Sequence, residues 1–322
     1  MADSLARSVS ALCLCALLLA PPAQGQTVST ALVQDYYSFN PGLGFEDISE
    51  LSIPVVAQFD LGSRTDLLVS TGYASLSSTG SDDNQDLSLS GLLDTEARLS
   101  YGLIPGRLSV LVSGVLPSGI QSVQADQVPL LALISNEALD MSTVRFGGGG
   151  GLGAGFAGAY PLGSMALGVA ATFREEFAYA PVADAPSELN PGIEARIRVG
   201  LEGPVTSLGY LRLAGVLSRR AEDQIDGDGQ GASGSLWTGY AALERSLTSS
   251  TLVLYLYDSF RTGPRIEGTA FGPTVLPRSN VFAIGGRWAF PLRGSDLITA
   301  RFEYRSTRAA PEVDVEELEA LG

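Results

Sequence analysis

The stretch from Gly91 to Gly119 constrains the fold most, because apolar and polar residues alternate on both sides of a short turn. Its first half carries Leu93, Thr95, Ala97, Leu99, Tyr101 and Leu103 on one parity, and Asp94, Glu96, Arg98 and Ser100 on the other. After Ile104-Pro105-Gly106 the alternation resumes, with Leu108, Val110, Val112, Gly114 and Leu116 opposite Arg107, Ser109 and Ser113. Only a strand sorts residues with a period of two. The stretch therefore predicts an antiparallel hairpin whose halves, at about 11 residues each, can cross a bilayer when tilted.

The same alternation recurs along the chain. It predicts further hairpins within 51–77, 147–177, 193–218, 234–261 and 279–305. Tight turns are expected at Gly62, Pro105, Pro161, Pro204, Thr248 and Arg293, and long connections at 78–90, 118–146, 178–189, 220–233 and 262–278. Short turns on one side, long loops on the other and aromatic residues near strand ends are typical of outer-membrane barrels. The sequence predicts an all-β fold, a transmembrane up-and-down antiparallel β-barrel. A soluble β-sandwich or β-helix would not need the aromatic residues at strand ends.

The strand count predicts an unfinished barrel. The hairpins and an earlier strand at Thr27–Phe39 give thirteen strands, within an expected range of about 12 to 14. An odd count leaves the chain end outside the cell, which closed bacterial barrels do not normally allow. Residues 308–322 are too acidic for a closing strand. We therefore expect a barrel over 26–307, an acidic tail or truncated loop over 308–322, and at least one strand missing at the C-terminal side.

The first 25 residues predict a cleaved secretory signal peptide. Arg7 precedes the short apolar run Ser10–Ala20, and Ala23-Gln24-Gly25 is a small-x-small cleavage pattern. Cys13 and Cys15 lie inside the apolar run without a good lipidation box, so a lipoprotein is less favoured. The predicted location is the outer membrane of a Gram-negative bacterium. The expected partners are outer-membrane lipid, lipopolysaccharide, small solutes and the barrel-assembly machinery.

Composition excludes several functions. The formal net charge is −15, which makes nucleic acid a poor partner. The chain has no histidine, and all 20 basic residues are arginine. Histidine is the usual general base and the commonest metal ligand. Outer-membrane phospholipases, lipid acyltransferases and omptin-type proteases resemble this architecture, but their chemistry depends on histidine. We therefore expect no enzyme and no cofactor.

The charged residues on the non-lipid parity are the candidate pore lining. The selected candidates are Arg98, Arg107, Arg174, Arg196, Arg198, Arg212, Arg287, Arg301, Glu96, Glu194 and Glu303, and the same parity also carries Arg305, Asp94, Glu176 and Glu244. Opposite charges on neighbouring strands can form ion-paired ladders that stiffen the wall and seal the lumen. The excess of arginine can instead line a pore that favours anionic or polar-headed solutes. Both readings stay open at the level of sequence.

The long connection after the organising hairpin predicts an inward-folded element. Its segment Val128–Ile134 is too apolar to extend into water. The adjacent glycine-rich stretch, 147–158, leaves room for another backbone. We expect the connection to fold into the lumen and pack on this glycine-rich wall. The alternatives place it on the outer leaflet or against a partner.

Two motif matches carry little weight. The pattern Gly153-x-Gly155-x-x-Gly158 resembles a dinucleotide fingerprint, but another strand follows instead of a helix. Asp223, Asp226 and Asp228 suggest a calcium loop, yet no glutamate stands at the twelfth position. A solvated acidic loop is the favoured reading, with weak divalent binding as the alternative.

The organising hairpin resembles one in Gram-negative barrels that transport fatty acids and aromatic hydrocarbons, including the phenol-degradation-pathway outer-membrane family. The similar residues are Asp94, Tyr101-Gly102-Leu103-Ile104-Pro105 and Gly114-Val115-Leu116-Pro117-Ser118-Gly119. The resemblance implies passive uptake of small hydrophobic molecules through a plugged barrel, although the N-terminal hatch of the fatty-acid transporters has no match here. The expected function is a passive channel for small hydrophobic or anionic solutes. The alternative is a sealed structural barrel that acts through its external loops.

Overall fold

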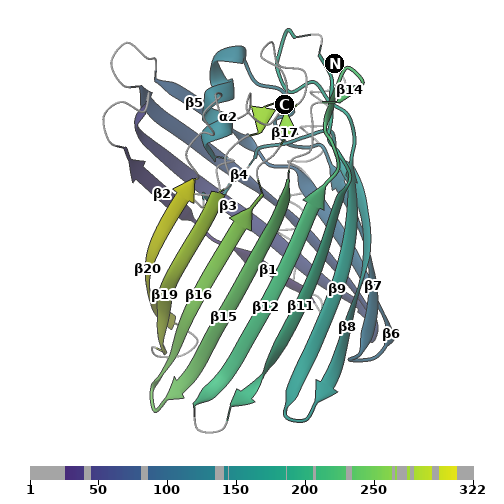
Figure 1. The fold of residues 1–322 in the computed structure, drawn as a ribbon, viewed down its shortest axis with the longest axis vertical. Helices are drawn as coiled ribbons and strands as arrows, with labels where there is room; N and C mark the ends of the chain where they lie inside the picture. The colour runs from purple at the N-terminus through teal and green to yellow at the C-terminus, as the bar shows by residue number, and fades with distance from the viewer. Residues whose placement is uncertain are drawn as a thin grey trace, which may run out of the picture.

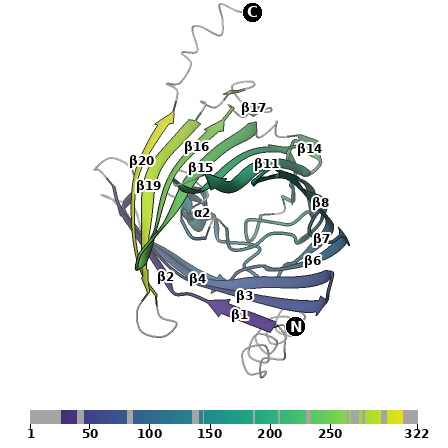
Figure 2. The same cartoon turned by 90° about the horizontal axis from the view of Figure 1, so that it is seen from below.

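The computed structural model describes residues 26–39, 45–80, 86–134, 141–143, 145–185, 187–205, 208–229, 234–262, 265–266, 274–275, 279–291 and 297–309. In this part of the chain, fifteen strands form one antiparallel sheet that curls into a barrel (Figures 1 and 2). They are β1 (Gln26–Thr30), β2 (Val33–Ser38), β3 (Phe45–Gly62), β4 (Thr65–Gly80), β5 (Leu87–Leu92), β6 (Thr95–Ile104), β7 (Leu108–Leu116), β8 (Gly151–Leu162), β9 (Met165–Glu176), β11 (Glu194–Val205), β12 (Gly209–Arg220), β15 (Ser235–Leu247), β16 (Ser250–Arg261), β19 (Ser279–Pro291) and β20 (Leu297–Ala309). This confirms the predicted all-β, up-and-down architecture.

The sheet has thirteen positions, as the sequence predicts. Its path runs β1-β3-β4-β6-β7-β8-β9-β11-β12-β15-β16-β19-β20. The strands β1 and β2 lie end to end along β3, and β5 and β6 lie end to end along β4. Within the described residues no ladder joins β20 to β1 or β2, although these edges lie on the same side of the barrel (Figure 2).

Short elements outside the barrel wall gather at one end, where the long connections lie. They are the 3₁₀ turn η1 (Ala125–Gln127), the helix α2 (Val128–Ile134), and the strands β10 (Leu189–Asn190), β13 (Gln224–Ile225), β14 (Asp228–Gly229), β17 (Arg265–Ile266) and β18 (Thr274–Val275). Tight turns join the strands at the other end (Figure 1). The predicted turn at Arg293, residues 1–25 and residues 310–322 lie outside the described residues. No described helix has the length and hydropathy of a membrane-spanning helix.

The outer face of the barrel is apolar. Large side chains stand exposed on it from every hairpin after β5, among them Leu99, Val112, Phe173, Ile197, Leu254, Ile284 and Phe302. The ladders place such residues opposite one another, as in the Cα pairs Leu99–Val112 and Leu256–Ile284. The charged residues of these strands occupy the other parity and face the interior. The period-two pattern therefore assigns the two faces as predicted.

A one-residue slip in register separates β5 from β6. Tyr73 of β4 pairs with Leu92, and Ser70 of β4 pairs with Glu96. The two pairs are therefore three residues apart on β4 but four residues apart on the partner chain segment. A shift of one residue moves side chains to the opposite face. Odd-numbered residues therefore face outward in β6, but Leu89 of β5 faces inward and is buried. The expectation of a loop over 78–90 was wrong, because β4 and β5 occupy most of it.

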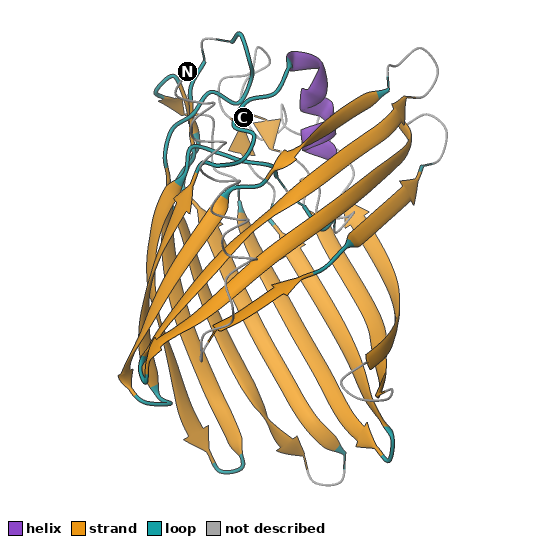
Figure 3. Cartoon of the chain, turned by 180° about the vertical axis from the view of Figure 1, so that it is seen from behind, coloured by secondary structure: helices purple, strands orange, loops and turns teal. Residues whose placement is uncertain are grey.

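The β3–β4 hairpin extends beyond the rest of the barrel and supports a plug. These strands have 18 and 16 residues, and α2 lies beside their far end (Figure 3). In α2, Leu130 and Ile134 are 0% and 1% exposed. They belong to a core with residues of β3, β4, β5 and the long connection: Ile48, Ala74, Leu76, Leu89, Val123, Met141 and Phe146. The apolar segment thus avoids water by folding inward.

The long connection folds inward as predicted. The prediction that it packs on the glycine-rich stretch 147–158 was wrong for the helix α2. The helix packs on β3, β4 and β5, where it contacts a cluster that includes the inner residues Ile48, Leu76 and Leu89. Gly91 of β5 makes room for Ile120, whose Cδ1 would lie 2.7 Å from a Cβ at that glycine. The glycine-rich stretch accommodates backbone instead, because a Cβ at Gly147 would lie 2.6 Å from the Ile120 carbonyl oxygen.

Adjacent residues of β11 provide a direct test of the two faces. Arg198 is on the inner parity and Val199 on the outer parity, and both are exposed. The chain after residue 25 contains no cysteine, so a single introduced cysteine can be labelled without background from other cysteines in this part of the chain. In lipid vesicles, we expect Arg198→Cys to react with a hydrophilic maleimide and Val199→Cys to be protected. Equal labelling of both variants would contradict the assignment of the faces.

Candidate solute path

The structure places most of the predicted lining residues on the inner face. Glu96 and Arg98 lie on β6, Arg174 on β9, and Glu194, Arg196 and Arg198 on β11. Arg212 lies on β12, Arg287 on β19, and Arg301 and Glu303 on β20. Arg107 is the exception, because it lies in the tight turn 105–107 at the end far from the plug, and not within a strand. Its carbonyl oxygen accepts a hydrogen bond from Ala159.

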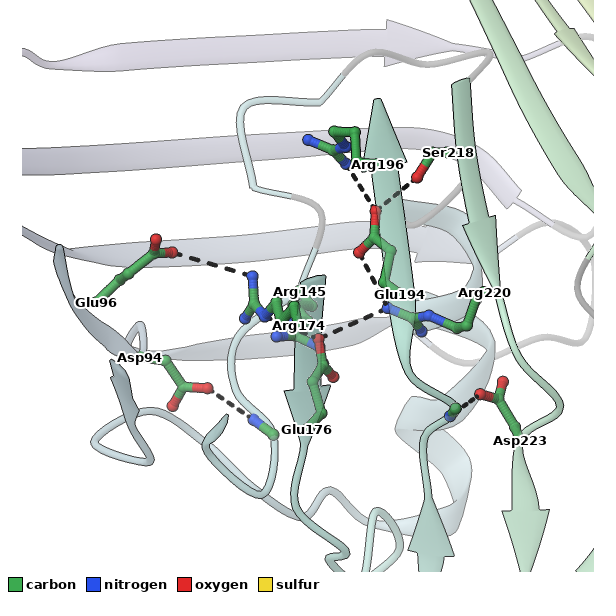
Figure 4. A network of polar contacts seen from close by, with 12 residues as sticks. Asp94, Glu96, Arg145, Arg174, Glu176, Glu194, Arg196, Ser218, Arg220 and Asp223 are labelled. Carbon is green, nitrogen blue, oxygen red and sulfur yellow. Dashed lines mark hydrogen bonds and ion pairs between the residues drawn. The ribbon is translucent and has the colours of Figure 1, made fainter. Parts of the chain in front are cut away.

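Glu176 is the centre of the largest polar cluster (Figure 4). It ends β9 and is 5% exposed. Its Oε2 lies 2.7 Å from Nη1 of Arg145, which comes from the long connection. Its Oε1 lies 3.4 Å from Nε of Arg174 and 3.6 Å from Nη2 of Arg220. Three arginines from three chain segments therefore share one buried carboxylate, which binds the plug to the wall.

The cluster continues along neighbouring strands. Arg174 reaches Glu96 of β6 at 4.0 Å. On the other side, Glu194 of β11 accepts hydrogen bonds from Arg196 at 2.9 Å and from Ser218 at 2.6 Å, and it lies 3.9 Å from Arg220. This row of alternating charges is the ion-paired ladder that the sequence suggested.

Burial and pairing set the charge states in the long connections. Burial opposes the charged form of Arg145, but the hydrogen bond and ion pair with Glu176 outweigh it and raise the pKa of Arg145 above its ordinary value. Burial also raises the pKa of the Tyr179 hydroxyl. Near neutral pH, Arg145 is therefore a permanent cation and Tyr179 remains a neutral hydrogen-bonding group.

Two smaller clusters lie elsewhere on the inner wall. Arg212 of β12 lies 3.2 Å from Glu244 of β15 and 3.9 Å from Glu202 of β11. On β20, Glu303 pairs with Arg301 at 2.9 Å and with Arg305 at 2.8 Å. Tyr255 of β16 donates a hydrogen bond to Glu303 and accepts one from Arg301 at 3.1 Å.

Three inner arginines have no ion-pair partner among the described residues: Arg98, Arg198 and Arg287. Arg198 lines a cavity of about 270 Å³ on the inner wall. The wall of this cavity is mostly glycine and alanine from β8, β9, β11 and β12, so no bulky side chain fills the space there. The interior therefore combines a closed ladder near the plug with unpaired positive charge farther down.

Asp94 fixes the path of the long connection. It occupies the slip between β5 and β6, where its backbone N–H donates to the Phe146 carbonyl at 3.2 Å. Its Oδ1 accepts the backbone N–H of Gly119 at 3.0 Å, and its Oδ2 accepts that of Gly148 at 2.9 Å. One carboxylate thus binds both ends of the connection. This gives a physical role to the aspartate and to the terminal glycine of the hairpin pattern at 91–119.

Arg145 and Phe146 stand between two cavities. The first cavity has a volume of about 320 Å³ and is mostly apolar, with Ile120, Val128 and Leu131 in its lining. The second has about 250 Å³ and is polar, with Asp94, Glu96 and Arg174 in its lining. Both cavities are lined by Arg145 and Phe146. This two-residue segment is therefore the common wall between an apolar chamber beside the plug and the charged lumen.

Sequence reasoning missed Arg145 and Arg220 as members of the site, and it placed Glu176 on the non-lipid parity without selecting it as pore lining. The sequence contained one signal for Arg145, which is the only basic residue between Arg107 and Arg174. The acidic loop residues set aside earlier have structural partners. Asp223 accepts the Gly192 N–H at 2.8 Å, and Asp226 accepts the Glu188 N–H at 2.7 Å.

The solved structures that resemble this chain include two distant outer-membrane proteins. No protein-family model and no curated protein matches the sequence. An outer membrane channel from Pseudomonas putida F1 aligns with 15% identity over 90% of this chain and 97% of that one, with a TM-score of 0.46. OmpF of Salmonella typhi, solved in complex with daunomycin, aligns with 10% identity over 88% and 97%, with a TM-score of 0.32.

The role of Glu176 can be measured against its neighbour. Glu176→Gln removes the charge shared by three arginines, and breaking a buried ion pair costs about 3–5 kcal/mol. We expect a lower free energy of unfolding in urea and faster hydrogen exchange at Gly148 and its neighbours. Glu175→Gln is the matched control, because Glu175 is exposed on the outward parity. Unchanged exchange in Glu176→Gln would show that the ion pairs do not hold the connection.

Proposed function

We propose that this protein is a passive outer-membrane channel for small solutes, and that the segment Arg145–Phe146 is its constriction. The observation that carries the proposal is that these two residues line both the apolar chamber and the charged lumen. In the proposed path, a solute that enters beside the plug passes these two residues to reach the lumen. The exposed apolar outer face supports a position in a lipid bilayer with lipopolysaccharide and lipid as neighbours.

The two chambers favour a solute with two different ends. The outer chamber offers Ile120, Val128 and Leu131 to an apolar body. Beyond the constriction, Arg98, Arg198 and Arg287, which have no ion-pair partner in the described part of the chain, favour negative charge on the same solute. We therefore infer a preference for small anions that carry an apolar group, such as aromatic or short aliphatic carboxylates. This combines the hydrophobic and anionic substrate classes that the sequence left open.

Transport by this path needs only binding and diffusion. No group of three or more histidine, cysteine, aspartate or glutamate side chains placed to hold a metal ion is found in the part of the chain that the structure describes. The carboxylates and guanidinium groups of the Glu176 cluster pair with one another (Figure 4). Selection of solutes by charge and size is the chemistry that this arrangement supports best.

Conductance of the purified protein in planar lipid bilayers tests the constriction. We expect discrete current steps from the wild-type protein, and steps at least about twofold larger from Arg145→Ala, because in the proposed path this side chain narrows the passage between the two chambers. The matched control is Arg64→Ala, since Arg64 is exposed in a tight turn at the opposite end of the barrel. A complete absence of steps in the wild type and in Arg145→Ala would instead support a sealed structural barrel.

Ion selectivity tests the role of the unpaired arginines. Replacement of Arg98, Arg198 and Arg287 by glutamine removes positive charge without breaking an ion pair between described residues. We expect the reversal potential in a salt gradient to shift toward cation preference, with little change in conductance. Arg212→Gln, which breaks the pair with Glu244, is a useful comparison because it should also lower stability. An unchanged reversal potential in the triple variant would remove these arginines from the selectivity mechanism.

A further inference from the structure

Two acidic residues lie directly opposite each other on the inner face of the barrel edge. Asp35 of β2 and Glu50 of β3 are Cα partners in the antiparallel ladder. Directly opposite residues leave a sheet on the same side with their Cβ atoms about 5 Å apart, where like charges repel. Glu50 is also 1% exposed, next to the apolar core around α2. The fold therefore brings two carboxylates together and removes one from water.

The described residues provide no counter-charge for Glu50. Neither of its carboxylate oxygens has a hydrogen-bond partner. No described arginine pairs with it, and its principal charged neighbour is Asp35, which is also acidic. The chain has no lysine or histidine that could take this role. A carboxylate buried without a partner is strongly unfavourable, so the site lacks a positive group.

Two buried hydroxyl groups lie on the same face or against the same carboxylate. Ser52 follows Glu50 by two residues on the same face and is 3% exposed, and Thr143 of the long connection lies against Glu50. Neither hydroxyl has a hydrogen-bond partner. Asp35 accepts hydrogen bonds through Oδ2 from the N–H and hydroxyl of Ser142, at 3.3 and 2.6 Å. This contact holds the segment 141–143 over the carboxylate pair.

We propose that Glu50, Asp35, Ser52 and Thr143 form a binding site for a divalent cation, Ca²⁺ or Mg²⁺. Both ions take oxygen ligands, with carboxylates as the charged ones. A cation would neutralise the opposed carboxylates, and the unpartnered hydroxyl oxygens would act as ligands to it. An anion is excluded by the two acidic groups. Soft metals are disfavoured because the described neighbours include no thiolate or imidazole.

The cation has a structural consequence for the plug. Glu50, Ser52 and Asp35 belong to the wall, whereas Thr143 belongs to the connection that continues to Arg145 and Phe146. A shared cation therefore binds the connection to the wall on the side opposite the Glu176 cluster. The site is independent of whether the barrel conducts, because it concerns only how the connection is held.

Calcium binding to the full-length chain tests the site. The chain is refolded from inclusion bodies into detergent, so that no lipopolysaccharide contributes metal sites. Binding of Ca²⁺ and of Mg²⁺ is measured by titration calorimetry, and the midpoint of thermal unfolding is measured with each metal and with EDTA. Glu50→Gln keeps the shape of the side chain and removes its charge. Glu46→Gln is the control, because Glu46 is exposed on the same strand.

We expect one saturable site in the wild type and in Glu46→Gln, with a rise of several degrees in the unfolding midpoint. Glu50→Gln should fold, lose this binding, and have the same midpoint with metal and with EDTA. Asp35→Asn should bind at least about tenfold more weakly, since one of the two charged ligands is gone. Equal metal binding by Glu50→Gln and wild type would overturn the proposal. Metal-insensitive stability of the wild type would also overturn it, and would indicate a protonated Glu50 instead.

Discussion

The structure depends on one constraint, which is that a strand inside a membrane must hydrogen-bond all its backbone groups to its neighbours and present an apolar face to lipid. The chain meets it with ladders that run without a break through most of the wall, from β6 to β20. Because side chains alternate along each strand, the same residues that satisfy lipid on one side leave the other parity free for charge. The apolar exterior and the arginine-rich interior therefore have a single origin.

The region from β2 to β5 departs from this regular pattern and carries the special features of the molecule. The slip at Leu93 and Asp94 turns Leu89 inward, so that the far end of the wall becomes apolar inside. An apolar interior cannot face water at low free-energy cost, and the segment Val128–Ile134 covers it. Asp94 and Glu176 then fix the two sides of the connection that follows. The plug is thus a consequence of a one-residue change in register.

Strand parity could be predicted from the sequence because it is a local property. Each hairpin after β5 has the faces that the alternation of residues such as Leu99 and Arg98 indicates. The start of β3 at Phe45 could not be predicted, because Glu46, Asp47 and Glu50 make the first residues of this strand resemble a polar loop. The strands on which α2 packs could not be predicted from the sequence, and neither could the ion pair between Arg145 and Glu176. Both depend on which distant segments meet across the interior, and a periodic pattern does not contain that information.

The fluorescence of the two native tryptophans tests the central claim, which is that the apolar parity faces lipid. Trp237 and Trp288 are 53% and 43% exposed on the outer face, near opposite ends of β15 and β19. In vesicles made with brominated lipids, the account predicts strong quenching of both tryptophans and little quenching by acrylamide in the aqueous phase. Efficient quenching by acrylamide with no effect of brominated lipid would contradict it.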